Sequence, residues 1–206
     1  MGFFAFWVVI LLVWVICLGL DEELALQLQR GSEAALENLV GRYHAPIHAY
    51  IIRMGCEYHI ASDIIQEVFL KVCRNIGKYR TELPFRPWIY TIASNTYKDY
   101  LKKAHVQRDV LGLELGEVLA VTADTPETTF LEHTEQETVK QALQCLGENY
   151  REVLILRFYQ ELKLDEIAET LQIPVGTVKS RLSTALRQLQ KMLIEGGSFN
   201  GNAKQC

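Results

Sequence analysis

The stretch LKLDEIAETLQIPVGTVKSRLSTAL, residues 162–186, decides the fold of the C-terminal part of this 206-residue chain. It holds two amphipathic segments, and Pro174 ends the first because proline cannot continue a helix. Asp165 lies in the first turn of the first segment, where its charge suits the helix dipole. Thr177 is a good N-cap for the second segment, and Gly176 before it permits a tight turn. These features predict two short helices joined by a turn.

The second segment has two faces of opposite character. Val178, Leu182 and Ala185 recur at i, i+4 and i+7 and face inward, while Ala168 in the first segment lets the two helices approach closely. The residues left facing outward are polar or basic: Lys179, Ser180, Ser183, Thr184 and Arg187. A helix with a packed back and a basic front, preceded by a short turn, can enter the major groove of DNA. The combination predicts a helix-turn-helix rather than an ordinary helical hairpin.

Charge is segregated along the chain, although the formal net charge is only −4. Residues 71–108 hold nine Lys and Arg against two Asp and Glu, and residues 176–191 hold four against none. Residues 109–138, which lie between them, hold eight acidic residues and no basic one. Two basic segments around an acidic one predict two nucleic-acid contacts joined by a linker that avoids DNA. Solvated helix faces are the alternative explanation, and charge alone does not decide between them.

The pattern upstream of the acidic segment is helical throughout, over residues 21–104. Pro46 is expected to open a helix that Gly55 closes. Ser62 or Asp63 can cap the next helix. The loop after that helix, TELPFRP at residues 81–87, has two prolines that forbid a continuous helix, and the helical pattern resumes after it.

The predicted fold is therefore all-α, with two small helical domains. Helical periodicity is lost after residue 104 and returns near residue 135. The expected boundaries are an apolar segment at 1–20, a helical domain at 21–105, an acidic flexible linker at 106–134, a helix-turn-helix domain at 135–195 and a disordered tail at 196–206.

An unbroken apolar run, FFAFWVVILLVWVICLGL, occupies residues 3–20. As a helix its 18 residues would extend roughly 27 Å, about the thickness of the hydrocarbon core of a bilayer. A secretory signal fits less well, because no basic residue precedes the run and no small-x-small site follows it. A soluble domain could also start at Asp21, with Leu20 read from an alternative start codon. The run is either an N-terminal apolar helix that spans the membrane or a wrongly assigned start, and both alternatives stay open.

The sequence shows no arrangement of residues typical of an enzyme or a metal site. The five cysteines form no C-x-x-C pair and have no histidine at metal-binding spacing. No glycine-rich phosphate loop and no catalytic constellation is present. We therefore expect no enzymatic activity, no cofactor and no metal, and reduced thiols in a cytosolic protein.

Three blocks of the sequence resemble a known family, in that family's order. IPVGTVKSRL at 173–182, after an E-I-A-E-x-L helix, is similar to region 4 of bacterial sigma factors of the extracytoplasmic-function (ECF) type, a subfamily of the sigma-70 family. SDIIQEVFLKVCRNIGKY at 62–79 resembles region 2.2, and PFRPWIYTIASNTYKDYLKK at 84–103 resembles regions 2.3 and 2.4. The resemblance covers nearly all of residues 21–193. It implies a factor that binds core RNA polymerase, recognises the −10 and −35 promoter elements and starts transcription of a stress or envelope regulon.

The resemblance also implies roles for individual residues. Asn95 matches the position that holds a displaced base of the −10 element, a role that suits an amide because it both donates and accepts hydrogen bonds. Phosphate contacts around it are expected from Arg86, Lys98, Lys102 and Lys103. The positions that face the −35 element are Lys179, Ser180, Ser183, Thr184 and Arg187. Core-polymerase contacts are expected from Asp63, Gln66 and Glu67.

The sequence departs from the family pattern in its helix-turn-helix. Gln172 stands where many helix-turn-helix proteins have glycine. Thr184 stands where family members often have arginine, and Ser183 where they often have an aromatic residue or histidine. The chain therefore approaches the −35 element without the arginine that the family often places there.

Partners and location follow from the same resemblance. The expected partners are core RNA polymerase, promoter DNA and an anti-sigma factor, with a membrane contact through residues 3–20 if that run is translated. The expected location is the cytoplasm, tethered to the inner face of the membrane in that case. Two other functions stay open: a helix-turn-helix regulator that binds a palindromic operator as a dimer, and a membrane-tethered signalling protein.

Overall fold

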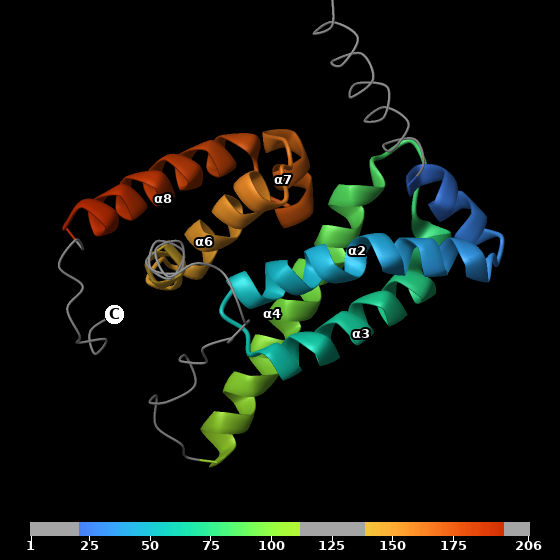
Figure 1. Cartoon of the computed structure of the whole chain (residues 1–206), viewed down its shortest axis with the longest axis horizontal. Helices are drawn as coiled ribbons and strands as arrows, with labels where there is room; N and C mark the ends of the chain where they lie inside the picture. Colours follow the sequence, from blue (N-terminus) through green and yellow to red (C-terminus); the bar gives the residue numbers. More distant parts are fainter. Residues whose placement is uncertain (1–20, 112–138, 196–206) are drawn as a thin grey trace, which may run out of the picture.

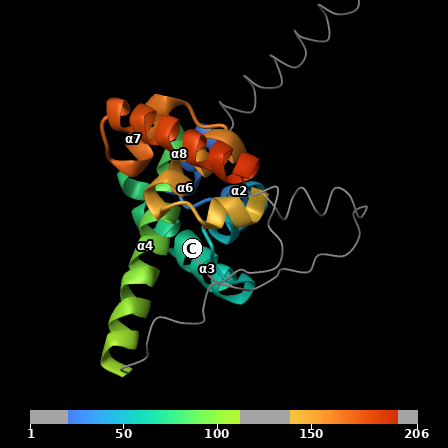
Figure 2. The same cartoon turned by 90° about the vertical axis from the view of Figure 1, so that its left-hand side faces the viewer.

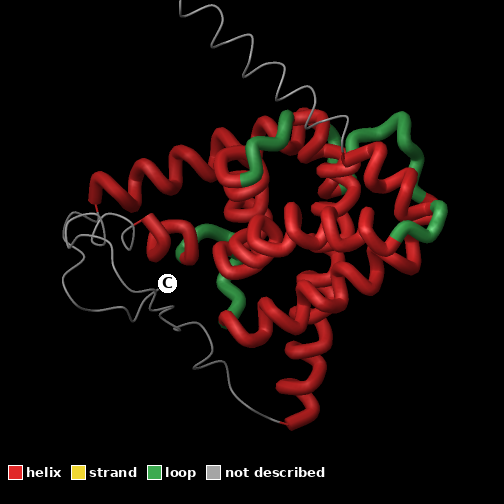
Figure 3. The backbone as a smooth tube through the Cα atoms, turned by 45° about the vertical axis from the view of Figure 1, so that its right-hand side comes forward, coloured by secondary structure: helices red, strands yellow, loops and turns green. Residues whose placement is uncertain are grey.

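The computed structural model describes residues 21–111 and 139–195, with side chains over residues 21–104 and 139–194. Every regular element in these ranges is helical, which confirms the all-α prediction (Figure 3). In chain order the elements are a helix at residues 21–29, α2 (Glu33–Arg53), α3 (Tyr58–Asn75), the 3-10 turn η1 (Ile76–Lys78), α4 (Phe85–Leu111), a helix at residues 139–144, α6 (Glu148–Leu154), the π-helix η2 (Ile155–Tyr159), α7 (Leu164–Leu171) and α8 (Val175–Glu195) (Figure 1).

Several predictions concern residues outside the described ranges. The apolar segment at 1–20, the tail at 196–206 and residues 112–138, which include most of the acidic linker, are among them. Within the described ranges, no helix has both the length and the apolar character needed to cross a membrane.

A single helix, α2, runs through the position where Pro46 was expected to start a new one. The prediction was wrong because Tyr43, Ile47 and Tyr50 on both sides of the proline are buried, and this burial outweighs the loss of one backbone hydrogen bond. The break lies earlier, at Gly31, whose φ of +88° suits glycine. The hydroxyl of Ser32 then accepts a hydrogen bond from the amide of Ala35 and caps α2.

Helix α3 also begins earlier than predicted. It starts at Tyr58, because the apolar pattern extends back to the buried Ala61, and neither Ser62 nor Asp63 is its cap. The hydroxyl of Ser62 instead donates to the carbonyl oxygen of Tyr58 at 3.1 Å. Asp63 is left exposed in the second turn of the helix.

Helix α4 is longer than predicted at both ends. It starts at Phe85, inside the expected loop, because Pro87 falls in the first turn, where no backbone amide is needed. The amide of Phe85 donates to a carboxylate oxygen of Glu22 at 2.9 Å. At the other end α4 continues to Leu111, past the expected domain boundary at residue 105, and projects beyond the neighbouring helices (Figure 2).

Helices α7 and α8 form the predicted helix-turn-helix, with a different start to α8. It begins at Val175, and the carbonyl oxygen of Pro174 accepts from the amides of Thr177 at 2.8 Å and Val178 at 3.1 Å. Thr177 is therefore inside the helix and is not its N-cap. Gly176 is also helical and has open space where a Cβ would lie, so the turn does not require glycine there.

The two halves of the chain pack directly on each other. Helix α7 packs on α4 (Figures 1 and 2). The π-helix η2 contacts α2. One continuous cluster of buried side chains contains Tyr50 and Ile89 from the first half together with Ile155 and Ile167 from the second. The described helices therefore share a single core.

Candidate nucleic-acid interface

The two faces predicted for α8 are confirmed. Val178, Leu182 and Ala185 are buried against α6 and α7, and Ile167 and Ala168 on α7 complete the packed side. The opposite face is open to solvent: Lys179, Ser180, Ser183 and Arg187 are exposed and Thr184 is half-buried. This face offers two cationic side chains and three hydroxyls on a rigid helix, a set that can bond both phosphates and base edges.

The turn before α8 is tight and carries backbone strain. Gln172 has a φ of +54°, in the left-handed region that favours glycine. The amide of Ile173 donates to the carbonyl oxygen of Ala168 at 3.0 Å, which closes the end of α7. At the start of α7, the carboxylate of Glu166 accepts a hydrogen bond from the amide of Lys163 at 2.7 Å. Gln172 therefore occupies a left-handed backbone position, where glycine is favoured because it has no Cβ to clash with the backbone.

Helix α4 presents the residues expected to bind the −10 element. Asn95, Lys102 and Lys103 are exposed, and Lys98 and Arg86 are half-buried. Residues 95, 98 and 102 follow at three- and four-residue steps and so share one stripe of the helix. Arg86 is nine residues before Asn95, on the other side of the helix, where burial raises the pKa of Tyr43 and Tyr90 and the charge of Arg86 opposes part of that rise. The structure thus groups three of the five residues on one stripe, leaves Lys103 beside that stripe and places Arg86 on the other side of the helix.

Lys98 has a partner that the sequence did not reveal. Its Nζ lies 2.9 Å from Oε2 of Glu152 in α6 and donates to the hydroxyl of Ser94 at 3.0 Å. In this arrangement Lys98 is the counter-ion of a buried carboxylate rather than a free phosphate ligand. Glu152 is 54 positions away in the chain, and no local pattern links the two residues.

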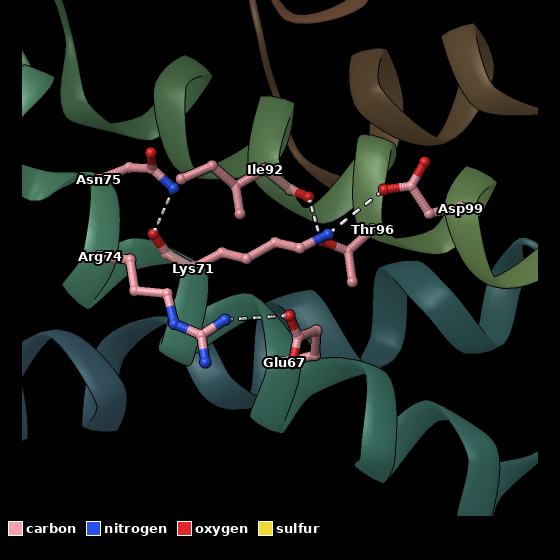
Figure 4. A network of polar contacts seen from close by, with 7 residues as sticks. All are labelled: Glu67, Lys71, Arg74, Asn75, Ile92, Thr96 and Asp99. Carbon is pink, nitrogen blue, oxygen red and sulfur yellow. Dashed lines mark hydrogen bonds and ion pairs between the residues drawn. The ribbon is translucent and has the colours of Figure 1, made fainter.

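Helix α3 carries the three residues expected to bind polymerase. Asp63 and Gln66 are exposed and Glu67 is half-buried, on the face opposite the buried Ile64 and Val68. Two ion pairs adjoin this stripe (Figure 4): Glu67 lies 3.7 Å from Arg74, and Lys71 of α3 reaches Asp99 of α4 at 3.3 Å. Both are solvent-exposed and contribute at most about 1 kcal/mol each. The Lys71–Asp99 pair joins α3 to α4, at a residue one turn after Asn95.

A buried polar cluster between the halves was also missed by the sequence reasoning. The hydroxyl of Tyr50 donates to Glu152, and burial together with that carboxylate holds the pKa of Tyr50 well above its usual range. Tyr90 donates to Gln160, which is itself buried. The available signal was Glu152 itself, a charged residue directly before the apolar run 153–156. Among the described residues, no three His, Cys, Asp or Glu side chains come close enough together to hold a metal ion.

Comparison with known proteins identifies both halves. The sigma-70 region 2 family matches residues 39–106, and the sigma-70 region 4 family matches residues 142–191. The RNA polymerase sigma-H factor of Pseudomonas aeruginosa is 33% identical over 180 residues, which cover 84% of this chain and 93% of that protein. The ECF RNA polymerase sigma factor SigW of Bacillus subtilis is 33% identical over 174 residues, or 81% and 93% of the two chains.

Two solved structures share the fold. CnrH, solved in complex with the cytosolic domain of CnrY, has a TM-score of 0.65 at 22% identity, over 85% of this chain and 98% of that one. The sigma factor RpoE of Bartonella quintana, solved with the anti-sigma factor NepR, has a TM-score of 0.65 at 23% identity, over 79% and 98% of the two chains.

Proposed function

This chain belongs to the ECF RNA polymerase sigma factors, and from that premise we propose that it binds core RNA polymerase, recognises −10 and −35 promoter elements and directs transcription of a stress or envelope regulon. It is a transcription initiation factor and not an enzyme. The observation that carries the proposal is the solvent-facing polar and basic side of α8, held by a fully packed back.

Recognition of the −35 element is assigned to α8. Lys179 and Arg187 supply the charge, and Ser180, Ser183 and Thr184 supply hydroxyls that can bond to base edges or phosphates. Because Thr184 cannot make the bidentate contact of an arginine, the strength of this interface depends more on phosphate contacts. Binding should accordingly be sensitive to salt.

Recognition of the −10 element is assigned to the exposed stripe of α4. Asn95 can bond to both a donor and an acceptor on a displaced base, and Lys102 and Lys103 can neutralise the flanking phosphates. Lys98 joins them only when it is released from Glu152, and Arg86 would act separately from this group.

Polymerase and an anti-sigma factor are the proposed protein partners. Asp63, Gln66 and Glu67 form a solvent-facing polar stripe on α3 that suits a basic surface of the core enzyme. CnrH was solved with the cytosolic domain of CnrY, and RpoE with the anti-sigma factor NepR. We propose that an anti-sigma factor of this kind also restrains the present chain.

The assigned DNA contacts predict a specific footprint. With purified core polymerase the chain should protect two separate patches of a cognate promoter, at −10 and −35, and alone it should protect neither strongly. Protection of one palindromic site in the absence of polymerase would instead identify a conventional operator-binding regulator.

Membrane contact through residues 3–20 stays a separate prediction. A chain that starts at Asp21 tests it by cell fractionation. Loss of membrane association on truncation would establish an anchor, whereas an identical distribution of both chains would establish that the run has no anchoring role.

A further inference from the structure

One carboxylate of the C-terminal half is buried among side chains of the N-terminal half. Glu152 of α6 is 1% exposed. Its Oε1 accepts from the hydroxyls of Tyr50 in α2 at 3.0 Å and Ser94 in α4 at 2.5 Å. Its Oε2 lies 2.9 Å from Nζ of Lys98, an ion pair without hydrogen-bond geometry of its own. We call Glu152, Tyr50, Ser94 and Lys98 the latch.

Further polar contacts between the halves flank the latch. Arg151 donates from Nη1 to the carbonyl oxygen of Met54 at 2.6 Å. Thr170 of α7 donates to the carbonyl oxygen of Pro87 at 3.3 Å. These contacts and the latch lie on one interface, where α6, η2 and α7 meet α2 and α4.

The latch gives this interface a polar position within the apolar core that the two halves share. A buried ion pair is seldom more stabilising than apolar residues of the same volume, because both charges lose their hydration. After separation, however, the carboxylate of Glu152 and the ammonium group of Lys98 can both be rehydrated, which offsets part of the cost of exposing the apolar side chains around them. The latch therefore adds one specific pairing to the apolar contacts that hold the two halves closed.

The closed arrangement cannot read both promoter elements at once. Asn95 is eight helical residues, about 12 Å, from Pro87. Lys179 is nine residues from Thr170, at most about 32 Å of extended chain. Since Thr170 contacts Pro87, Asn95 and Lys179 are within about 50 Å of each other. The two elements are about 25 base pairs apart by name, or about 85 Å of DNA that is stiff at this length.

We propose that Lys98 changes partner in an intramolecular switch. While the halves are closed its ammonium group neutralises Glu152, and once they separate it binds a phosphate of the −10 element. The proposal rests on the promoter-binding function above. A DNA phosphate and Glu152 compete for the same ammonium group, so binding of the −10 element weakens the closed form. By the same competition the latch weakens DNA binding by the free chain.

Two substitutions separate the two partners of Lys98. Glu152→Gln keeps an acceptor for Tyr50 and Ser94, removes the charge and leaves Lys98 free. Lys98→Met, at a half-exposed position, breaks the same ion pair and also removes the phosphate ligand. Asp99→Asn is the matched control, since it removes one negative charge at the adjacent residue and breaks only the pair with Lys71 inside the N-terminal half.

The experiment measures the radius of gyration of the full chain by small-angle X-ray scattering and its affinity for a −10 oligonucleotide, after circular dichroism has verified folding. Both latch variants should expand relative to wild type and to Asp99→Asn. Glu152→Gln should bind the oligonucleotide about tenfold more tightly than Asp99→Asn, as expected if about a tenth of the free wild-type chain is open. Lys98→Met should bind it more weakly than Glu152→Gln by severalfold.

The latch and the proposed function fail in different ways. If wild type supports transcription with core polymerase but both latch variants stay as compact as Asp99→Asn, with unchanged affinity, the latch is refuted and the function stands. Should Glu152→Gln fail to fold, the compactness of Lys98→Met decides the same question. If wild type supports no transcription with any promoter, the proposed function itself fails.

Discussion

The guanidinium group of Arg151 donates a hydrogen bond to the backbone carbonyl oxygen of Met54 at 2.6 Å, across the interface between the two halves. Its other nitrogens donate to carbonyl oxygens at the end of the helix at 139–144 and in the turn after it, those of Leu143, Gln144 and Leu146. One side chain thus caps a helix of the C-terminal half and binds the end of α2. Burial lowers the pKa of this group, which still carries its charge at neutral pH.

Arg151→Lys should therefore destabilise the protein although charge is conserved. A lysine ammonium lacks the planar fork that reaches carbonyls in several directions, so at least one buried carbonyl loses its donor. We expect a loss of about 1–3 kcal/mol in the free energy of unfolding, measured by urea titration. Arg157→Lys is a suitable comparison, because Arg157 is exposed and donates to a single carbonyl oxygen. Equal losses for the two variants would contradict the assignment.

The backbone φ at three positions should decide whether glycine or another residue is the more stable choice there. Gln172→Gly relieves the strain of a φ of +54° and should stabilise the protein by about 1 kcal/mol. Gly176→Ala, in a helix with open space for a Cβ, should stabilise it by about 0.5–1 kcal/mol. Gly31→Ala, at a φ of +88°, should destabilise it by about 1 kcal/mol. Thermal or urea unfolding checks all three signs, and a stabilising Gly31→Ala would be inconsistent with the turn described.

Asn95→Ala should slow open-complex formation at the cognate promoter while binding to core polymerase persists. The reason is the loss of the amide that bonds a displaced base. Permanganate reactivity of unpaired thymines measures opening, and native gel electrophoresis measures core binding. Asn38→Ala is the control, because Asn38 is exposed on α2 and its amide donates to Ala34 of the same helix. Normal opening by Asn95→Ala would remove this residue from the interface.

Lys179→Ala and Arg187→Ala should each weaken promoter binding by the holoenzyme and reduce its dependence on salt. Each phosphate contact that is lost should lower the slope of log affinity against log salt by about 1. Arg30→Ala, which removes an exposed positive charge far from α8 in the chain, should leave that slope unchanged. A slope unaffected by both α8 variants would show that this face does not contact DNA.

Charge reversal on α3 should separate polymerase binding from folding. Asp63→Arg places a positive charge on a solvent-facing stripe and should weaken core binding about tenfold, equivalent to about 1.4 kcal/mol. Glu37→Arg, an exposed reversal on α2, is the control. Surface plasmon resonance with immobilised core enzyme measures both, and matching affinities would exclude Asp63 from the contact.

The features predictable from the sequence are those that depend on neighbours in the chain. The faces of α8 follow from helical periodicity over a few turns, and Val178, Leu182 and Ala185 are buried as expected. The start of α2 could not be placed in the same way, because the cost of Pro46 inside a helix is offset by packing against distant residues. Local helix propensity does not include the free energy gained by packing against residues that are distant in the chain.

The contacts between the two halves could not be predicted from local sequence patterns. Glu152 bonds to Tyr50 and Ser94, which precede it by 102 and 58 positions, and these pairs meet only after both halves have folded. Lys98 was therefore assigned to DNA from the family resemblance alone, and its second partner emerged only from the packing of α6 against α2 and α4.

The central claim is that the exposed faces of α4 and α8 direct polymerase to promoters, and run-off transcription from purified components tests it most directly. With the full chain and core RNA polymerase, we expect transcripts of defined length from a subset of genomic promoters and none from core alone. The Asn95→Ala and Lys179→Ala chains should give fewer transcripts at equal occupancy of the core enzyme. If the purified full chain binds core polymerase and yields no promoter-specific transcript from any genomic fragment, the account is contradicted.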